Sequence, residues 1–230
     1  MTKEIVFINT TDAKFLEKPK PASTFIPDWY KEMESYSGGK KKPDGRGKTT
    51  ATIKRCMPVF DAMTAGYIIT LAADVHVSQK DGKPWYEWTS FNIVEFHQVE
   101  QAPEHPARND MPVYAKFGNP WGIKTPKGYS SLFVQPFHRE SPFMILEGIV
   151  DTDTYNAPVN FPFVLKDTKF EGMIPAGTPI AQVIPFKREN WKSSMGSKKD
   201  ISNYVNQSFM LATKFFDRYK SMFRQHKEYK

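Results

Sequence analysis

Residues 177–184 read GTPIAQVI, and this stretch decides the fold class. Ile180, Val183 and Ile184 are residue types that favour β-strands. Gly177 stands at the edge of the run, where a turn or a close backbone approach requires the absence of a side chain. The stretch therefore predicts a β-strand that follows a glycine-marked bend.

Short runs of the same kind fill the chain from Thr52 to Phe186. Val, Ile, Phe, Tyr and Trp dominate them and Gly, Pro, Asn or Asp bound them, as in residues 67–71, 85–96, 132–134, 143–150, 159–165 and 180–186. Asp81-Gly82 is a turn signal between two such runs. Short strands at frequent intervals are typical of a sandwich, barrel or clip of mixed β-sheet. The sequence therefore predicts a mainly β protein.

The residues before this β region have a different texture. Pro27 favours a short helix from Asp28 to Tyr36, because proline fits the first turn of a helix. Apolar side chains at positions i, i+4 and i+7 of that helix would share one face; they are Trp29, Met33 and Tyr36. Residues 37–48 carry four glycines and five positive charges, which predicts a surface loop.

The C-terminal residues differ again. From Asp200 onward, bulky apolar residues recur every three or four positions, opposite basic side chains. This pattern predicts an amphipathic helix of about seven turns, with Asp200 as its N-cap. The apolar stripe needs a cover, either a groove on its own domain or a neighbouring subunit. The predicted domains are an extension at 1–50, a β domain at 51–190 and this helix at 191–230.

Composition excludes several kinds of site. Cys56 is the single cysteine of the 230 residues, which rules out an intramolecular disulfide and a multi-cysteine zinc site. The five histidines are scattered, with no pair at helical metal-ligand spacing. We therefore expect no metal site built from His and Cys.

Charge and hydropathy bear on location and partners. No stretch approaches the roughly 20 apolar residues that span a membrane, and the start resembles neither a secretory signal nor a transit peptide. We therefore expect a cytoplasmic protein without a membrane partner. The net charge of +7 favours anionic partners such as nucleotides or nucleic acid. Much of it lies in Lys40–Lys42 and after Trp191, which favours a solvated basic face over a nucleic-acid site.

Three more stretches precede GTPIAQVI in a definite order. They are TAGY at 64–67, PKGYS at 126–130 and EGIVDTDTY at 147–155. In order and spacing the four resemble the motifs of the dUTPase and dCTP-deaminase superfamily, over roughly Pro58 to Phe186. The resemblance implies a compact β-clip fold, and in the enzymes of the family it implies a nucleotide substrate.

The resemblance also implies roles for individual residues. Asp151 matches the aspartate that activates the attacking water, and Mg²⁺ on the phosphates would neutralise the developing charge. Nucleotide binding would fall to Arg139, Ser141, Gly148, Tyr155 and Gln182. For the Asp-Thr-Asp-Thr segment an alternative remains open, a turn whose side chains bond their own backbone.

Several positions depart from the family pattern. Ile68 follows AGY where the family usually has aspartate, and Glu140 follows Arg139 where serine and glycine are expected. The amphipathic helix replaces the Gly-rich, Arg-containing tail of the trimeric enzymes. The leading hypothesis is a diverged, non-catalytic, oligomeric binding or assembly module, similar to uncharacterised phage proteins of this superfamily and located in the cytoplasm or a virion.

Two alternatives to this hypothesis stand. The first is a Mg-dependent nucleotide pyrophosphohydrolase with Asp151 as base, Arg139 as phosphate clamp and Gln182 as support. The weaker one is nucleic-acid binding through the basic C-terminal helix and the loop Lys40–Lys48.

Overall fold

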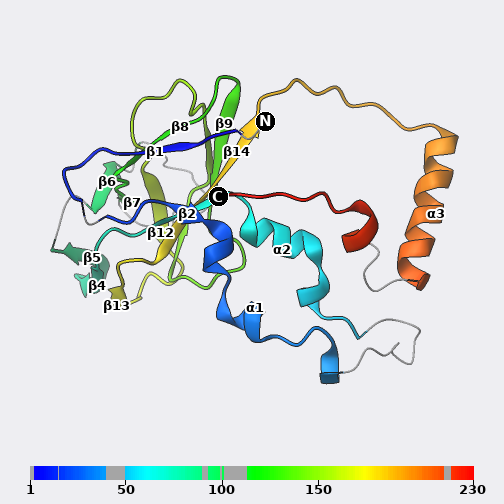
Figure 1. Cartoon of the computed structure of the whole chain (residues 1–230). Helices are drawn as coiled ribbons and strands as arrows, with labels where there is room; N and C mark the ends of the chain where they lie inside the picture. Colours follow the sequence, from blue (N-terminus) through cyan, green and yellow to red (C-terminus); the bar gives the residue numbers. More distant parts are fainter. Residues whose placement is uncertain are drawn as a thin grey trace. The chain divides into compact units, whose positions relative to one another are not determined.

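The computed structural model describes residues 3–14, 16–39, 50–89, 93–98, 100, 113–214 and 219–230. The described residues are mainly β, with several small antiparallel sheets and a C-terminal helix (Figure 1). They divide into two compact units. The β unit lies within Met1–Phe25, Gly66–Arg188 and Tyr229–Lys230, and the helical unit within Ile26–Ala65 and Glu189–Glu228.

The described residues of the β unit form four sheets. The five-stranded sheet has the order β11 (Gly148–Val150), β9 (Tyr129–Val134), β14 (Pro179–Lys187), β3 (Tyr67–Thr70) and β2 (Lys20–Pro21). The four-stranded sheet has the order β10 (Phe143–Ile145), β12 (Phe161–Leu165), β7 (Val113–Phe117) and β6 (Val94–Gln98). The smaller sheets are β13 (Gly172–Ile174) with β4 (Val75–Lys80) and β5 (Lys83–Trp88), and β1 (Val6–Asn9) with β8 (Trp121–Lys124). The 3₁₀ helix η1 (Ala22–Phe25) follows β2.

All described strand pairs are antiparallel, so the prediction of a mixed sheet was wrong. The mainly β class is confirmed. Alternating side chains from the sheets meet in one apolar core. At its centre the Phe117 and Phe163 rings stack with centroids 3.9 Å apart, and Phe143 packs edge-on against both. Burial of these aromatic side chains is a main source of stability for the unit.

The predicted strand at GTPIAQVI is β14, and it is the centre of the five-stranded sheet. It pairs with β3 on one side and β9 on the other, so the segments that follow AGY and PKG lie beside it. Gly66 shows why the AGY bend needs glycine. Its φ is +68°, and a Cβ built there would lie 1.9 Å from the carbonyl oxygen of Val183. An L-side chain at this position would collide with the neighbouring backbone.

The hairpin predicted at Asp81-Gly82 is confirmed. β4 and β5 pair in register from Val75↔Trp88 to Lys80↔Lys83, and only these two residues connect them. Asp81 and Gly82 have φ values of 52° and 72°. Positive φ at both central positions is the two-residue turn geometry that matches the twist of β-strands, and Asp-Gly favours it.

The helical unit contains α1 (Asp28–Glu32), η2 (Ser37–Gly39), η3 (Ile53–Arg55), α2 (Met57–Thr64), α3 (Lys198–Lys214) and the π-helical turn η5 (Tyr219–Phe223). The predicted helix at Asp28 exists but is shorter than predicted, because Met33 takes an extended ψ of 135° and ends it. Tyr30, outside the predicted apolar face, is its buried side chain, and Trp29 is 38% exposed. The sequence pattern gave no indication of α2.

The C-terminal helix is present as α3, but its start was assigned to the wrong residue. Ser197 is the N-cap, because its Oγ accepts a hydrogen bond from the backbone N–H of Asp200. The Asp200 carboxylate in turn accepts from the backbone N–H and the hydroxyl of Ser197. This is a reciprocal capping box. These hydrogen bonds from Ser197 lower the pKa of Asp200.

A second difference concerns helix length. α3 is described as far as Lys214, and residues 224–230, within the predicted helical region, form neither helix nor strand. Phe215 and Phe216 of the predicted stripe, and the loop Lys40–Lys48, lie outside the described residues. Among the helices that the structure describes, none is long and apolar enough to cross a membrane.

Within the helical unit, an ion cluster joins the C-terminal segment to α2. Arg224 donates to Asp61 Oδ1 from Nε and Nη2, at 2.9 and 2.6 Å, and Lys227 Nζ lies 3.0 Å from Oδ2. The Asp61 side chain is only 13% exposed. The hydrogen bond from Arg224 lowers the pKa of Asp61. Both basic partners are over 160 positions from Asp61 in sequence.

Candidate functional site

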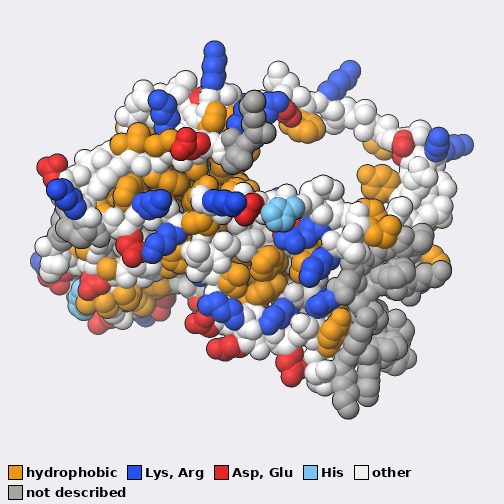
Figure 2. Space-filling view, viewed as in Figure 1, with side chains coloured by type: hydrophobic (Ala, Val, Ile, Leu, Met, Phe, Trp, Pro, Cys, Tyr) orange, Lys and Arg blue, Asp and Glu red, His pale blue; other side chains and the backbone are white. Residues whose placement is uncertain are grey.

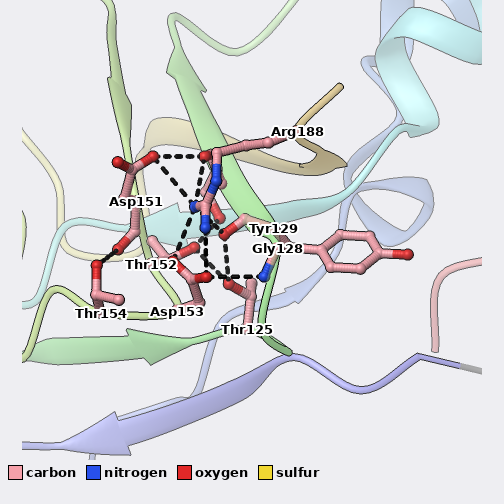
Figure 3. A network of polar contacts seen from close by, with 10 residues as sticks. Thr125, Gly128, Tyr129, Asp151, Thr152, Asp153, Thr154 and Arg188 are labelled. Carbon is pink, nitrogen blue, oxygen red and sulfur yellow. Dashed lines mark hydrogen bonds and ion pairs between the residues drawn. The ribbon is translucent and has the colours of Figure 1, made fainter. Parts of the chain in front are cut away.

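The EGIVDTDTY segment contributes its acidic side chains to a polar network at one end of β9 and β14 (Figure 3). Arg188, the residue after β14, is its positive centre. The guanidinium binds Asp153 in a bidentate manner, with Nη1 2.8 Å from Oδ1 and Nη2 2.5 Å from Oδ2. Asp153 Oδ2 also accepts the backbone N–H of Gly128 at 2.8 Å. The Asp153 side chain is 3% exposed.

These contacts fix the protonation state of the pair. The hydrogen bonds from Arg188 and then Gly128 lower the pKa of Asp153 to about 2. Asp153 in return raises the pKa of Arg188. Bidentate pairing of this kind is geometrically specific as well as strong. Asp153 is therefore an ionised carboxylate whose two oxygens both have partners.

Asp151 joins the same network but is more open to solvent. Its Oδ1 accepts a hydrogen bond from Ser130 Oγ at 2.6 Å and lies 3.3 Å from Arg188 Nη1. Its side chain is 62% exposed. Arg188 Nη1 also contacts the carbonyl oxygen of Tyr129 and the hydroxyl of Ser130. One carboxylate oxygen of Asp151 therefore points at a guanidinium and a hydroxyl, not at an open ligand position.

Beneath the acidic residues lies a chain of buried hydroxyls. Thr152 Oγ1 is 2.8 Å from Thr125 Oγ1 and 2.9 Å from Ser131 Oγ. Thr125 Oγ1 donates to the carbonyl oxygen of Tyr129. The three side chains are nearly inaccessible to water. Because buried hydroxyls are costly without partners, their mutual bonds hold residues 125, 131 and 152 in one arrangement.

Backbone geometry explains how the two aspartates reach Arg188. β11 pairs with β9, which places Val150 opposite Ser131, and β14 pairs with β9 up to Lys187↔Tyr129. After β11 the chain turns, with the N–H groups of Thr154 and Tyr155 donating to the carbonyl oxygen of Asp151. The backbone N–H of Arg188 bonds to the carbonyl oxygen of Gly128. The Asp-Thr-Asp-Thr segment is thus a hydrogen-bonded turn that faces the end of β14.

Other residues singled out from the sequence lie at the opposite end of β9. Gln182 is 1% exposed, pairs with Val134 across the sheet, and accepts the backbone N–H of Phe137 at 3.1 Å. Arg139 is two residues after Phe137 in the sequence. Ser130, which contacts Asp151, and Val134 are four residues apart, or roughly 13 Å along a strand. The structure therefore brings Gln182 near the start of the 136–141 segment and separates it from Asp151.

The remaining expected site residues have distinct surroundings. Arg139 Nη2 is buried and has no hydrogen-bond partner among the described residues, and burial lowers the pKa of Arg139. Ser141 Oγ accepts the backbone N–H of Phe143 at 3.3 Å. Gly148 begins β11, with nothing within 4 Å of a Cβ built there. Tyr155 is 47% exposed.

Arg188 is the residue of this network that sequence reasoning missed. It follows the GTPIAQVI motif by four positions, and its contacts depend on how β14, β9 and β11 pair. Ser130, by contrast, belongs to the PKGYS motif. A basic residue just past a central strand is a weak signal on its own, because many strands end in Lys or Arg.

The network does not offer a set of ligands for a divalent cation. Both oxygens of Asp153 and one oxygen of Asp151 are engaged by Arg188, Gly128 or Ser130. A guanidinium at this position would repel a cation. In the part of the chain that the structure describes, no group of three or more His, Cys, Asp or Glu residues could hold a metal ion. The arrangement can hold together three segments: the turn at 128–130, the turn at 151–154, and Arg188 at the end of β14. It leaves much of the Asp151 side chain open to solvent.

Comparison with known proteins does not assign the chain to a family. Neither the protein-family models nor the curated proteins contain a match to this chain.

Proposed function

We propose that the chain is a diverged, non-catalytic member of the dUTPase-like β-clip superfamily and acts as an oligomeric binding or assembly module. The observation that carries the proposal is the engagement of Asp151 and Asp153 by Arg188. A general base must direct a carboxylate oxygen at the attacking water. Here Ser130 and Arg188 engage one oxygen of Asp151, and Arg188 and Gly128 engage both oxygens of Asp153, which supports a structural role for the acidic segment between strand ends.

The β-clip assignment has support from the placement of the motifs. Gly66 of AGY packs against the backbone of Val183 in β14, and Gly128 of PKGYS bonds to Asp153. Four stretches that are distant in sequence thus meet in a small antiparallel β unit. The resemblance in motif order supports the assignment to this family. The proposed location, the cytoplasm or a virion, rests on that resemblance alone.

Exposed apolar side chains support the oligomeric part of the proposal. On α3, Ile201, Tyr204 and Val205 are 60–78% exposed. Figure 2 shows hydrophobic side chains at the surface of the segment that α3 forms in Figure 1. An uncovered apolar stripe on an amphipathic helix is a common protein contact surface.

Arg139 gives the proposed module a place to bind an anion. Its buried Nη2 has no acceptor among the described residues, and an unpaired guanidinium donor is costly unless an acceptor completes it. A nucleotide phosphate would supply that acceptor. Binding without hydrolysis is therefore the expected behaviour toward nucleotides.

To test the proposal, the full chain is incubated with each dNTP and Mg²⁺. Pyrophosphate release and the melting temperature of the chain are then measured. We expect no release for any dNTP. Pyrophosphate release that disappears in Asp151→Asn would overturn the non-catalytic assignment and support the pyrophosphohydrolase alternative. A nucleotide-dependent rise in melting temperature that Arg139→Met removes would support the anion site, and no rise with any dNTP would remove it.

Nucleic-acid binding through the basic C-terminal helix remains the weaker proposal. On the face shown in Figure 2, Lys and Arg side chains are spread over several parts of the surface. Binding to duplex DNA that falls steeply with added salt would support it. Absence of binding at low salt would exclude it.

A further inference from the structure

The β unit contains a pocket of about 320 Å³ that the polar network does not use. Segments from several sheets line it. Its apolar walls include Ile93, Pro120 and Pro158, and its polar groups include Thr10, Glu95 and Asn160. A pocket of roughly 300 Å³ is at the lower end of the range for small-molecule sites, so its occupant would be a small molecule.

The floor of the pocket is rigid because of Asn119, which is 5% exposed. Its Nδ2 donates to the carbonyl oxygens of Trp121 and Val159, at 2.9 and 3.1 Å, and its Oδ1 accepts the backbone N–H of Trp121. The Asn119 backbone N–H donates to Asn160 Oδ1 at 3.1 Å. Every polar group of the Asn119 side chain is thus satisfied. The segments around Asn119 and Asn160 are held in place before any ligand arrives.

Further bonds fix the remaining walls. The backbone N–H and hydroxyl of Thr10 both bond to the carbonyl oxygen of Pro120, at 2.9 Å each. The backbone N–H of Gly118 bonds to the carbonyl oxygen of Ile93 at 2.8 Å. A pocket whose walls are already ordered costs little conformational entropy on binding.

Two side chains of the lining have hydrogen-bonding atoms that no described residue engages. Asn160 uses Oδ1 for Asn119, and its Nδ2 makes no hydrogen bond with any described residue. Glu95 is paired across the strands with Lys116, with Nζ 2.8 Å from Oε2, and its Oε1 has no partner in the described residues. The lining of the pocket therefore includes an amide donor from the residue before β12 and a carboxylate acceptor from β6.

The charge balance selects against anions. No Lys or Arg is among the described residues that line the pocket, and Lys116 neutralises Glu95 from outside it. A phosphate or carboxylate ligand would add a negative charge beside the Glu95–Lys116 pair, and no second cation among the described lining residues would balance it. An uncharged ligand that both donates and accepts avoids this penalty, because it donates to Glu95 and accepts from Asn160.

We propose that this pocket binds a neutral sugar ring through two adjacent hydroxyl groups. Each hydroxyl of a vicinal diol can donate one hydrogen bond and accept others. One hydroxyl would donate to Glu95 Oε1 and its neighbour would accept from Asn160 Nδ2, while the C–H face of the ring packs against Ile93 and the two prolines. This site is separate from the Arg188 network, and the inference does not depend on the proposed function.

Saturation-transfer NMR and calorimetry on the full chain provide the test. The probes are glucose, galactose, mannose and N-acetylglucosamine, with trans-1,2-cyclohexanediol and cyclohexanol as a matched pair of minimal ligands. We expect saturable 1:1 binding of at least one sugar, and binding of the diol but not of the mono-alcohol. No binding of any sugar at millimolar concentration to the folded chain overturns the proposal.

Two variants test the assigned groups. Asn160→Asp keeps the oxygen that accepts from Asn119 but removes the Nδ2 donor, and Glu95→Gln keeps the size of the side chain but removes the charged acceptor. Each is expected to weaken sugar binding by about tenfold, the effect of one lost hydrogen bond in a desolvated site. Asp151→Asn, outside the pocket, is the control and should bind as the wild type does.

Circular dichroism first establishes that each variant is folded. If one variant does not fold, the other still decides. Sugar binding that is unchanged in a folded Asn160→Asp or Glu95→Gln variant overturns the assignment of the pocket. A failed dNTP assay leaves this result untouched, because the probes carry no phosphate.

Discussion

At the residue scale, Asp153 and Arg188 form the pair with the clearest pH dependence. The pKa of Asp153 is about 2 in the folded chain, below the ordinary value of about 3.9 for an unfolded aspartate. The folded state therefore binds fewer protons than the unfolded state as the pH falls below about 4. The stabilisation by this carboxylate is present above that pH and is lost as the pH falls toward 2.

Urea unfolding at a series of pH values checks this expectation. We expect Asp153→Asn to be less stable than the wild type at pH 6 and to lose less of its stability between about pH 4 and 2. Asp151→Asn, at the more exposed carboxylate, is the matched control. Equal losses in the wild type and Asp153→Asn over this range would contradict the role given to the pair.

Gly66 supports a second prediction at this scale. Gly66→Ala should destabilise the chain by more than ~1 kcal/mol, because its φ is unfavourable for alanine and the added Cβ would collide with the Val183 carbonyl oxygen. Gly148→Ala is the matched control, since a Cβ there meets nothing within 4 Å, and its effect should stay below about 0.5 kcal/mol. Chemical denaturation of both variants measures the difference, and equal effects would refute the argument.

The role of a single residue could be predicted from the sequence where the local backbone conformation determines which residue type fits. The glycine that precedes the GTPIAQVI strand, Gly177, was predicted from its place at a strand edge, and its φ of +81° is one that favours glycine. Arg188 could not be found this way, because its partners are 35–59 positions away and meet it only through the pairing of β14, β9 and β11. Motif order located the acidic segment, but not the cation that neutralises it.

At the element scale, local turn chemistry was the reliable signal. Asp81-Gly82 predicted the β4–β5 hairpin, and β-branched runs predicted β3 and β14. α2 was missed because Met57-Pro58-Val59-Phe60 reads as another apolar β-type run. Its proline lies in the first turn, where helices accept it. Short apolar segments of this kind cannot be assigned from periodicity alone.

A prediction at this scale concerns α3 as the proposed assembly surface. Val205→Lys places a charge on the exposed apolar stripe and is expected to reduce the oligomer to smaller species. Asn203→Lys adds the same charge on the opposite face of the helix and should leave the assembly unchanged. Light scattering coupled to gel filtration measures the mass. A mass that does not change in Val205→Lys, or a wild-type monomer, would remove α3 as an assembly surface.

At the scale of the whole molecule, contacts between distant parts of the chain define each unit. Asp61 on α2 is bound by Arg224 and Lys227. We expect Asp61→Asn to destabilise the helical unit by about 1–3 kcal/mol, because two nearby cations lose their anionic partner. Lys227→Met, at a half-exposed position, should cost less than about 1 kcal/mol.

Hydrogen exchange of the amides in α2 and η5 reports on this unit. Faster exchange in Asp61→Asn than in Lys227→Met is the expected order, and the reverse order would contradict it. Sequence could not predict the cluster, since nothing local links Asp61 to a segment over 160 positions away. The mainly β class, by contrast, follows from the frequency of short β-type runs and was predictable.

The engagement of Arg188 by Asp153 also has a consequence for proteolysis. Residues 189–197 form neither helix nor strand and all of them are exposed, which makes them suited to limited digestion by trypsin. Trypsin must draw the basic side chain before the scissile bond into its own pocket, and the Arg188 guanidinium is held elsewhere. Within residues 188–197 the first cut should therefore follow Lys192, and a cut after Arg188 should appear early only in Asp153→Asn. Mass spectrometry of the early fragments would show whether the carboxylate shields that bond.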